Sequence, residues 1–481
     1  CLLEDPEFTR RINLRSLAEY LTYLYVPAPA TMFEGVEELP AGHLLTWSKG
    51  TTQVRRYWQL RYHEARGKPE SYYLESFSAK LADAVKSHLV SDVPLGAFLS
   101  GGIDSGTVVA LMTEATGQPA ETFTMGFEGD YGFYDERAQA RLVAQKYRSR
   151  HHEFVVRPDV GQILPQILRA FDQPHADSSA IPNYYICELA RKHVTVALSG
   201  LGGDELMGGY ERYLGILLGE RMRKLPFALR RLLARAARAL PDLGGRGRFS
   251  AARLKRFAEC AQHDAAEAYL SLISTFGSAD LPQLLAGAAR AELQHHGPAD
   301  RMRASFEESG SSDRVNQMLF ADSMQYLPGD LLPLTDRMSM AHSLEVRVPF
   351  LDHELVELAA SIPPEYKIRG MSKKHLLRRV ASPLLPREIV EREKRGFSVP
   401  LAFWFREELR GLVRGQLAPE RVSRLGYFDP RYVTTLVEEH MNGATNHENR
   451  IWALLLFVLW HQLYLEGTPV AMEELRSGAA R

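Results

Sequence analysis

The chain has 481 residues, with 58 lysines and arginines against 59 aspartates and glutamates, and three cysteines. A net charge near zero excludes a global field that would attract nucleic acid or a membrane surface. Three cysteines form neither a disulfide framework nor a metal-site spacing, and they suit a reducing compartment. No apolar run reaches the roughly 18 residues that a membrane span requires. We therefore expect a soluble, cytoplasmic enzyme of two or three domains that acts on small molecules.

The first sixty residues predict a short helix followed by a pair of strands. Residues 17–21 favour a helix, whereas 26–29 favour extended chain because a proline disfavours helix in the residue before it. Two strands are predicted at 39–45 and 53–58, joined by the turn residues 48–50.

A glycine loop follows the first strand of a larger domain. A predicted helix at about 72–87 leads into an apolar strand at 94–99, and residues 99–105 then read Leu-Ser-Gly-Gly-Ile-Asp-Ser. A helical pattern of apolar residues follows the loop. Strand, tight glycine loop and helix form a frame that suits anion binding, because the N–H groups of the helix start face the anion. The structural alternative is a simple glycine turn.

The side chains of this loop match phosphate chemistry. Gly101 and Gly102 allow the backbone to approach an anion closely, and Ser100 and Ser105 add hydroxyl donors. Asp104 suits magnesium, which bridges carboxylates and phosphates in such sites. The Walker sequence occurs nowhere in the chain.

Further strands alternate with helices and predict a parallel sheet. Strands are expected at 121–127, 151–156 and 194–198, with a helix from about Asp135 between the first two. His151 and the neighbouring histidine are expected to pack or face solvent rather than bind metal.

A second glycine loop follows the strand at 194–198, with the sequence Ser199-Gly200-Leu201-Gly202-Gly203-Asp204-Glu205. Parallel strands that end in such loops form the crevice where open α/β sheets bind ligands. Asp204 can then share a magnesium ion with Asp104.

From Glu205 onward the pattern is nearly all helical. Residues 221–240 predict a basic amphipathic helix, which we interpret as a surface helix with its apolar face on the core rather than a membrane-bound one. Residues 242–248 are glycine-rich and predict a loop.

Four motifs, in order, resemble the synthetase domain of glutamine-hydrolysing asparagine synthetases, which belong to the ATP pyrophosphatase superfamily. They lie at residues 99–105, 171–182, 194–205 and 336–352, and the resemblance runs from about Leu14 to about Tyr464. It implies an α/β fold, with a parallel-sheet ATP pyrophosphatase core and a largely helical C-terminal part.

The resemblance also implies a domain organisation. Residues 1–60 are expected to be the C-terminal remnant of an N-terminal nucleophile glutaminase domain, and 61–481 the synthetase domain. Within the latter we expect the core at about 72–215 and the helical region at about 216–470. Family members begin with a cysteine followed by Gly-Ile or similar. Here Leu2 and Leu3 follow Cys1, so we expect Cys1 not to be the nucleophile and the full protein to carry a longer glutaminase domain.

Family members cleave ATP between the α and β phosphates, adenylate a carboxylate and release pyrophosphate. The resemblance implies ATP and Mg²⁺ as cofactors, with Asp104 and Asp204 on the metal. Lys374 matches the family's phosphate-binding lysine, and Lys394 is a weaker candidate. The expected contacts to ATP and pyrophosphate are Leu99, Ser100, Gly101, Gly102, Asp104, Ser105, Met125, Ser199, Gly200 and Lys374.

Leu201 departs from the family pattern, which often places an acid at this position. Leucine cannot accept the proton that ammonia loses after its attack, so we consider Glu345 as the base and Arg347 as the anchor of the substrate carboxylate. The alternative is a structural ion pair between these two residues.

Three functions stay open at this point. The first is amidation of aspartate to asparagine. The second is the same chemistry on another carboxylate, including intramolecular amide closure as in β-lactam synthetases. The third is a catalytically silent homologue, which intact Asp104, Asp204 and Lys374 disfavour. A homodimer is one option for the assembly.

Overall fold

The computed structural model describes residues 2–128, 135–223, 225–226, 229, 263–295, 297–392 and 399–468. Cys1, Lys394 and most of the predicted helix at 221–240 lie outside these ranges, as does the predicted loop at 242–248. Within the described ranges, none of the helices combines the length and the apolar character that crossing a bilayer demands.

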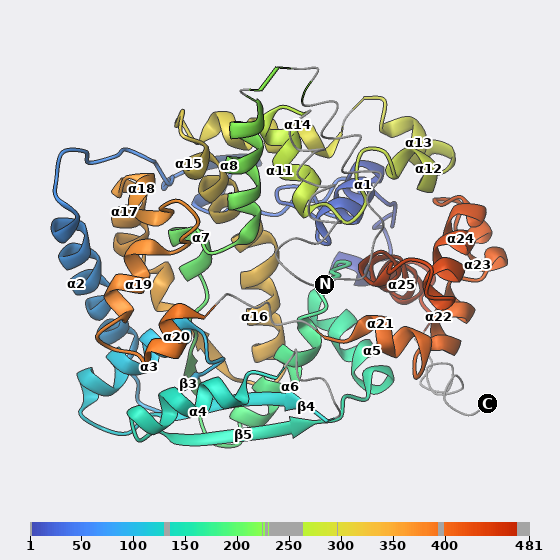
Figure 1. The fold of residues 1–481 in the computed structure, drawn as a ribbon. Coiled ribbons are helices and arrows are strands. Elements are labelled where there is room, and N and C mark those ends of the chain that lie inside the picture. The colour runs from blue at the N-terminus through green and yellow to red at the C-terminus, as the bar shows by residue number, and fades with distance from the viewer. Residues whose placement is uncertain are drawn as a thin grey trace.

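In the described part of the chain the strands form two separate sheets. The strands are β1 (His43–Ser48), β2 (Thr51–Arg56), β3 (Leu95–Phe98), β4 (Glu121–Phe127), β5 (Arg150–Val156), β6 (Val196–Leu198) and β7 (Glu345–Arg347). Figure 1 labels β3, β4 and β5 of the larger sheet. The helices up to residue 223 are η1 (Leu2–Glu4), α1 (Leu14–Tyr23), α2 (Glu70–His88), α3 (Ile103–Thr116), α4 (Arg137–Lys146), α5 (Val160–Phe171), α6 (Ala180–Ala190), α7 (Gly203–Met207) and α8 (Glu211–Arg223).

The remaining helices fill the C-terminal half. They are α11 (Ala265–Ile273), α12 (Leu281–Leu284), α13 (Gly287–Glu292), α14 (Pro298–Glu308), α15 (Arg314–Ala321), η2 (Asp322–Leu331), α16 (Leu332–Met340), η3 (Pro349–Leu351), α17 (His353–Ser361), α18 (Pro364–Lys367), α19 (His375–Ala381), α20 (Arg387–Glu391), α21 (Leu401–Arg406), α22 (Arg410–Gln416), α23 (Pro419–Leu425), α24 (Pro430–Met441) and α25 (Glu448–Tyr464).

The larger sheet has five parallel strands in the order β5-β4-β3-β6-β7. Its central strand places Ala97 opposite Thr122 on one side and Leu198 on the other. Because all strands run in the same direction, their carboxyl ends meet at one edge of the sheet. This confirms the predicted fold class, a parallel-sheet α/β domain with a largely helical C-terminal part.

β7 is the strand that the sequence analysis missed. Glu345–Arg347 pairs with β6, placing Glu345 opposite Val196 and Arg347 opposite Leu198. Three residues are too few to show the alternation that identifies a strand. The nearly all-helical region therefore contributes one edge strand to the sheet.

Apolar residues cover both faces of the sheet, as a parallel sheet requires. Ala97 and Leu198 belong to a core formed with α2, α3, α17 and α19. Phe123 and Met125 belong to a second core, which continues through α5 and α6 to α25.

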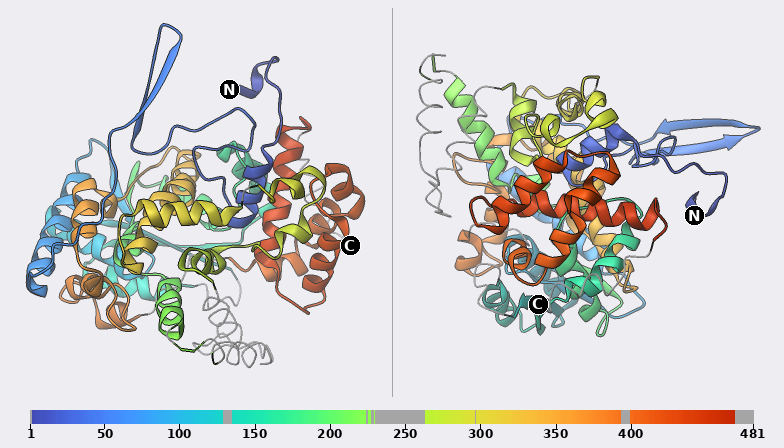
Figure 2. Two further views of the ribbon diagram at one scale, coloured as in Figure 1. Left: turned by 90° about the horizontal axis from the view of Figure 1, so that it is seen from above. Right: turned by 90° about the vertical axis from the view of Figure 1, so that its right-hand side faces the viewer.

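The N-terminal segment joins this second core instead of standing apart. Leu17 and Leu21 of α1 are fully buried in it, and the Tyr20 hydroxyl donates a hydrogen bond of 2.8 Å to the Ala453 carbonyl of α25. The antiparallel hairpin β1–β2, by contrast, stands out from the body of the protein (Figure 2). Its exposed apolar residues include Leu45, Trp47 and Val54.

Candidate active site

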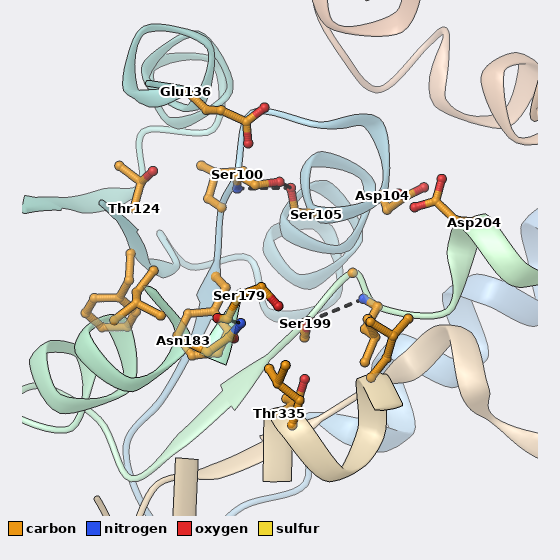
Figure 3. Close-up of a pocket in the computed structure, with 18 of the residues that line it drawn as sticks. Ser100, Asp104, Ser105, Thr124, Glu136, Ser179, Asn183, Ser199, Asp204 and Thr335 are labelled. Atoms are coloured by element: carbon orange, nitrogen blue, oxygen red, sulfur yellow. Dashed lines mark hydrogen bonds between the residues drawn. The ribbon is translucent and has the colours of Figure 1, made fainter. Parts of the chain in front are cut away.

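The first glycine loop connects β3 to α3, as the sequence predicts. Gly101 has a φ of +69°, and a Cβ there would lie 2.6 Å from the Gln139 Cβ and 2.7 Å from the Ala140 nitrogen of α4. Only glycine combines that conformation with such a close approach. The Ser100 and Ser105 hydroxyls lie 3.1 Å apart inside the loop (Figure 3). The first-turn N–H groups of α3 follow directly, and they have no acceptor within the helix.

The second glycine loop connects β6 to α7 and packs onto the first. A Cβ on Gly200 would lie 2.5 Å from the Ser105 nitrogen, and one on Gly203 would lie 2.7 Å from Asp104 Oδ1. These contacts bring the two loops together at the carboxyl edge of the sheet. Asp204, the second residue of α7, thereby lies beside Asp104 with its carboxylate turned toward it (Figure 3).

Lys374 lies between these two carboxylates. Its Nζ is 2.6 Å from Asp104 Oδ2, 2.8 Å from Asp104 Oδ1 and 2.7 Å from Asp204 Oδ1. All three residues are buried, with exposed fractions of 3–7%. One ammonium facing two carboxylates leaves one negative charge, and buried charges in such an arrangement are costly unless they are paired.

Local backbone geometry places the lysine. Lys374 is the N-cap residue of α19 and has a left-handed φ of 51°, a conformation that non-glycine residues seldom adopt outside sites that need it. Gly209 provides the space, because a Cβ there would overlap Asp204 Oδ1 and Lys374 Cε.

A cavity of about 350 Å³ opens beside this cluster at the carboxyl ends of β3, β4 and β6 (Figure 3). One part is apolar, with Phe98, Leu99, Met125 and Ile186 among its lining residues. Its polar lining comprises Ser100, Asp104, Ser105, Thr124, Glu136, Asp177, Ser179, Asn183, Ser199, Asp204, Glu205, Tyr210, Tyr326 and Thr335. An apolar region next to buried polar groups suits a ligand with a flat base and a charged end.

Glu205 adds a perturbed carboxyl to the wall. Burial, and after it the charge of Asp204, raises the pKa of Glu205 to about 7. Its Oε1 accepts a hydrogen bond from the Tyr210 hydroxyl.

The structure does not bring Glu345 and Arg347 into this cavity. Glu345 stands at the amino end of β7, opposite the first residue of β6, and its side chain is 56% exposed. Arg347 Nε donates to Glu345 Oε1 at 2.6 Å, and its Nη1 donates to the carbonyls of His88 and Val90. This is the structural ion pair that the sequence analysis kept as the alternative. Neither residue is among those that line the cavity.

Among the predicted ATP contacts, Leu99, Ser100, Asp104, Ser105, Met125, Ser199 and Gly200 line the cavity. Sequence reasoning missed Glu136, Asn183, Tyr326 and Thr335. Glu136 directly precedes α4, Asn183 lies in α6, Tyr326 in η2 and Thr335 in α16. These segments are far apart in the sequence, and only the fold brings them together. Asp177 belongs to the motif at residues 171–182, but that motif did not predict that Asp177 would line a cavity.

The described residues contain no group of three or more histidine, cysteine or acidic side chains that could hold a metal ion. At this site the protein offers two carboxylates, Asp104 and Asp204. Magnesium is commonly held by one or two carboxylates together with substrate phosphates and water, so this donor set fits the ion.

Comparisons with known proteins cover nearly the whole chain. The family model for asparagine synthase matches residues 76–462, and that for the glutamine amidotransferase domain matches residues 1–58. Asparagine synthetase [glutamine-hydrolyzing] 1 of Bacillus subtilis is 33% identical over 462 residues, which are 95% of this chain and 70% of that protein. A putative asparagine synthetase [glutamine-hydrolyzing] of Mycobacterium bovis is 34% identical over 98% of this chain and 71% of its own length. The amidase chyE of Penicillium rubens is 26% identical over 85% of this chain and 65% of its own length.

Proposed function

Because the chain belongs to the asparagine synthase family, we propose that it is an ATP-dependent ligase that converts a carboxylate, most favourably the aspartate side chain, into an amide. The observation that carries this proposal is the contact of Lys374 with Asp104 and Asp204 at the polar end of a cavity formed by two glycine loops. Such a site presents cations and N–H donors where a triphosphate would lie.

In this proposal the apolar end of the cavity holds adenine and the glycine loops hold the phosphates. Leu99, Met125, Ser199 and Gly200 contact the nucleoside. The phosphate contacts are Ser100, Gly101, Gly102, Asp104, Ser105 and Lys374. Asp104 and Asp204 are the residues that would hold Mg²⁺, which when bound supplies positive charge against the phosphate oxygens.

The first chemical step is attack of the substrate carboxylate on the α-phosphorus, with pyrophosphate as the leaving group. Negative charge builds on the leaving phosphates. The N–H groups at the start of α3 and the Lys374 ammonium meet that charge, and they are oriented before the reaction begins.

In the second step ammonia attacks the acyl carbon, and AMP leaves. Leu201 lines the cavity but cannot accept the proton that is released. Besides Asp104 and Asp204, which this proposal assigns to Mg²⁺, the described wall of the cavity holds the carboxylates of Glu136, Asp177 and Glu205, and these could accept it.

We propose glutamine as the natural nitrogen source, through an amidotransferase part to which residues 1–58 belong. The match of these residues to the amidotransferase model supports this, as do the names of the relatives. Free ammonium should serve the synthetase step directly.

The second candidate is the same chemistry on a different carboxylate. Two observations support this second candidate. Leu201 stands where family members often carry an acid, and one relative is named as an amidase. The two candidates share the adenylation step and differ only in the acyl substrate.

The decisive experiment supplies ATP, Mg²⁺ and ammonium with a panel of carboxylates, and measures pyrophosphate, AMP and the amide. Aspartate should give asparagine with equimolar AMP, and chelation of Mg²⁺ should stop the reaction. A different carboxylate with higher kcat/KM would establish the second candidate. Absence of pyrophosphate release with every carboxylate would refute both.

A further inference from the structure

A carboxylate from outside the cavity holds the chain on both sides of Lys374. Glu70 is the first residue of α2, and its side chain is 20% exposed. It is not among the described residues that line the ATP cavity. Its two oxygens accept hydrogen bonds from three basic side chains within the segment 369–379. Nothing in the adenylation step uses Glu70 directly, so these contacts require another explanation.

The three contacts of Glu70 surround Lys374 in the sequence. Arg369, five residues before the lysine, donates from Nη2 to Glu70 Oε2 at 2.9 Å. His375 follows the lysine directly, and its Nε2 lies 2.9 Å from Glu70 Oε1. Arg379, five residues after the lysine, donates from Nη1 to the same oxygen at 2.6 Å. One carboxylate therefore holds the chain before and after Lys374.

The chain on each side of Lys374 has little freedom to bend. Before it, Arg369 and Ser372 exchange two backbone hydrogen bonds of 3.0 and 2.9 Å, which close a turn around Gly370. After it, the Arg378 nitrogen donates to the Lys374 carbonyl at 2.8 Å, at the start of α19. Because a closed turn and a helix flank the lysine, a displacement at either end would move the lysine as well.

Lys374 depends on this support because its own backbone conformation is unfavourable. Its φ of 51° is left-handed, and a non-glycine residue keeps that conformation only where the surrounding structure imposes it. Its Nζ also lies within 2.6–2.8 Å of Asp104 and Asp204, so a small backbone movement would break these contacts. Glu70 can impose the conformation, since hydrogen bonds between ionised groups are the stronger class.

The Glu70 carboxylate is charged at neutral pH. Burial acts to raise its pKa, but the hydrogen bonds from Arg379, His375 and Arg369 outweigh burial and lower the pKa to about 2. Removing this charge therefore requires a substitution rather than a change of pH.

We propose that Glu70 is a positioning residue for adenylation, which fixes the Lys374 ammonium where the β and γ phosphates of ATP would lie. This inference rests on the proposed function, in which Lys374 contacts the phosphates. Glu70 acts through the lysine and does not touch ATP itself. A change at Glu70 should therefore affect recognition of the phosphates and leave recognition of the nucleoside intact.

The test compares ATP with AMP, which lacks the two phosphates in question. In titration calorimetry with Mg²⁺, Glu70→Gln should raise the Kd for ATP about 5-fold or more and leave the Kd for AMP within about 2-fold, because only ATP loses a charge-assisted hydrogen bond. Exchange of labelled pyrophosphate into ATP, with aspartate and saturating ATP, should slow about 10-fold or more, since a small misplacement can cost up to about 10²-fold. Glu70→Asp keeps the charge and should recover part of both losses.

Glu354→Gln is the matched control. Glu354 of α17 accepts a hydrogen bond of 2.8 Å from Lys80 of α2, so this variant also removes a carboxylate charge from an ion pair between α2 and another helix. The pair is exposed, and exposed ion pairs contribute little. Both Kd values and the exchange rate should stay within about 2-fold of the wild type. A melting temperature for each variant reports any general loss of stability.

A double variant distinguishes positioning from a general structural effect. In a Lys374→Met background, Glu70→Gln should change the Kd for ATP by less than about 2-fold, because effects exerted through one shared contact do not add. Fully additive effects would overturn the proposal. Should Lys374→Met fail to fold, the single variant Glu70→Gln decides, since an equal loss of affinity for ATP and AMP would show a general structural role.

Failure of this inference and failure of the proposed function give different results. If the wild type supports no exchange with any carboxylate, the proposed function fails. If exchange proceeds but Glu70→Gln weakens ATP and AMP alike, or weakens neither, only the role of Glu70 fails.

Discussion

The Lys374 ammonium contacts both carboxylate oxygens of Asp104, at 2.6 and 2.8 Å, across a separation of 270 residues in the chain. Asp104 lies in the first turn of α3, which follows the central strand, whereas Lys374 is the N-cap residue of α19 in the C-terminal half. The polar end of the cavity therefore exists only when that half is folded against the sheet. This relationship determines how the site should respond to substitution.

Asp104→Asn should reduce pyrophosphate formation by about 10²-fold or more at saturating ATP and Mg²⁺. The change removes a charge that holds Lys374 and would hold the metal, and single groups of this kind are commonly worth that much. Steady-state kinetics with pyrophosphate detection measure it. Asp92→Asn is the control, because Asp92 is exposed and precedes β3 at the opposite end of the strand. Equal turnover in both variants would contradict the role assigned to Asp104.

Gly209→Ala should abolish most activity while leaving the fold largely intact. The three atoms nearest to the added Cβ all belong to side chains, Asp204 Oδ1, Asp204 Cγ and Lys374 Cε, and these side chains can turn aside. That movement relieves the clash but dismantles the cluster. Thermal unfolding and pyrophosphate release, measured on the same samples, separate the two effects.

The matched glycine control is Gly415→Ala in α22. Gly415 is exposed, and a Cβ there meets nothing within 4 Å. Alanine in an exposed helical position should add up to about 1 kcal/mol to the free energy of unfolding, with unchanged kinetics. Loss of activity in this variant would show that the assay responds to glycine replacement in general.

Glu345→Gln should slow neither adenylate nor amide formation, because Glu345 is exposed at the amino end of β7. Arg347→Ala should lower the free energy of unfolding by about 1–3 kcal/mol, since it removes donors to the carbonyls of His88 and Val90. Chemical denaturation and pyrophosphate exchange measure these effects. A selective loss of amide formation in Glu345→Gln would restore that residue as the base.

Lys367→Met should stabilise the protein at neutral pH by on the order of 1–4 kcal/mol. Lys367 is fully buried, its Nζ lies 3.3 Å from Asn316 Oδ1, and burial lowers its pKa from 10.5 to about 7. Between these two values the unfolded chain binds more protons, so the wild-type free energy of unfolding should rise with pH from about 7 to 10.5.

The lysine variant should lose this rise. Denaturant unfolding at several pH values measures it, with the exposed Lys192→Met as control. A slope that persists in Lys367→Met would mean that another group is responsible.

Much of the fold could be predicted from local pattern. The strand at 121–127 was predicted at its observed bounds, and both glycine loops lie where their sequences placed them. Long apolar alternation and glycine spacing are local properties that a sequence displays directly. The β1–β2 hairpin was predicted too, with strands at 39–45 and 53–58, whereas the structure has them at His43–Ser48 and Thr51–Arg56. The turn residues of a hairpin locate its turn better than the outer ends of its strands.

What the sequence could not show depends on tertiary packing. η2 has no recognisable pattern of its own, and the close approach of its Gly329 to the Tyr25 ring is visible only in the fold. Arg212 reads as one more charged residue at the start of a helix, and only the fold surrounds it with tyrosines. A motif suggested Glu345 as the base, and only the fold shows that this residue begins a three-residue strand and does not line the cavity.

The hydrogen bond from Tyr20 to Ala453 has a consequence for how this chain could be divided. One family model ends at residue 58 and the other begins at residue 76. This division suggests two separable modules that recombination could exchange. Yet α1 and α25 bury their side chains in a common core. A protease that cut the exposed stretch at 65–68 would therefore leave two fragments still bound to each other. A foreign N-terminal part, spliced in at that point, would have to reproduce the packing of α1 before the hybrid could fold.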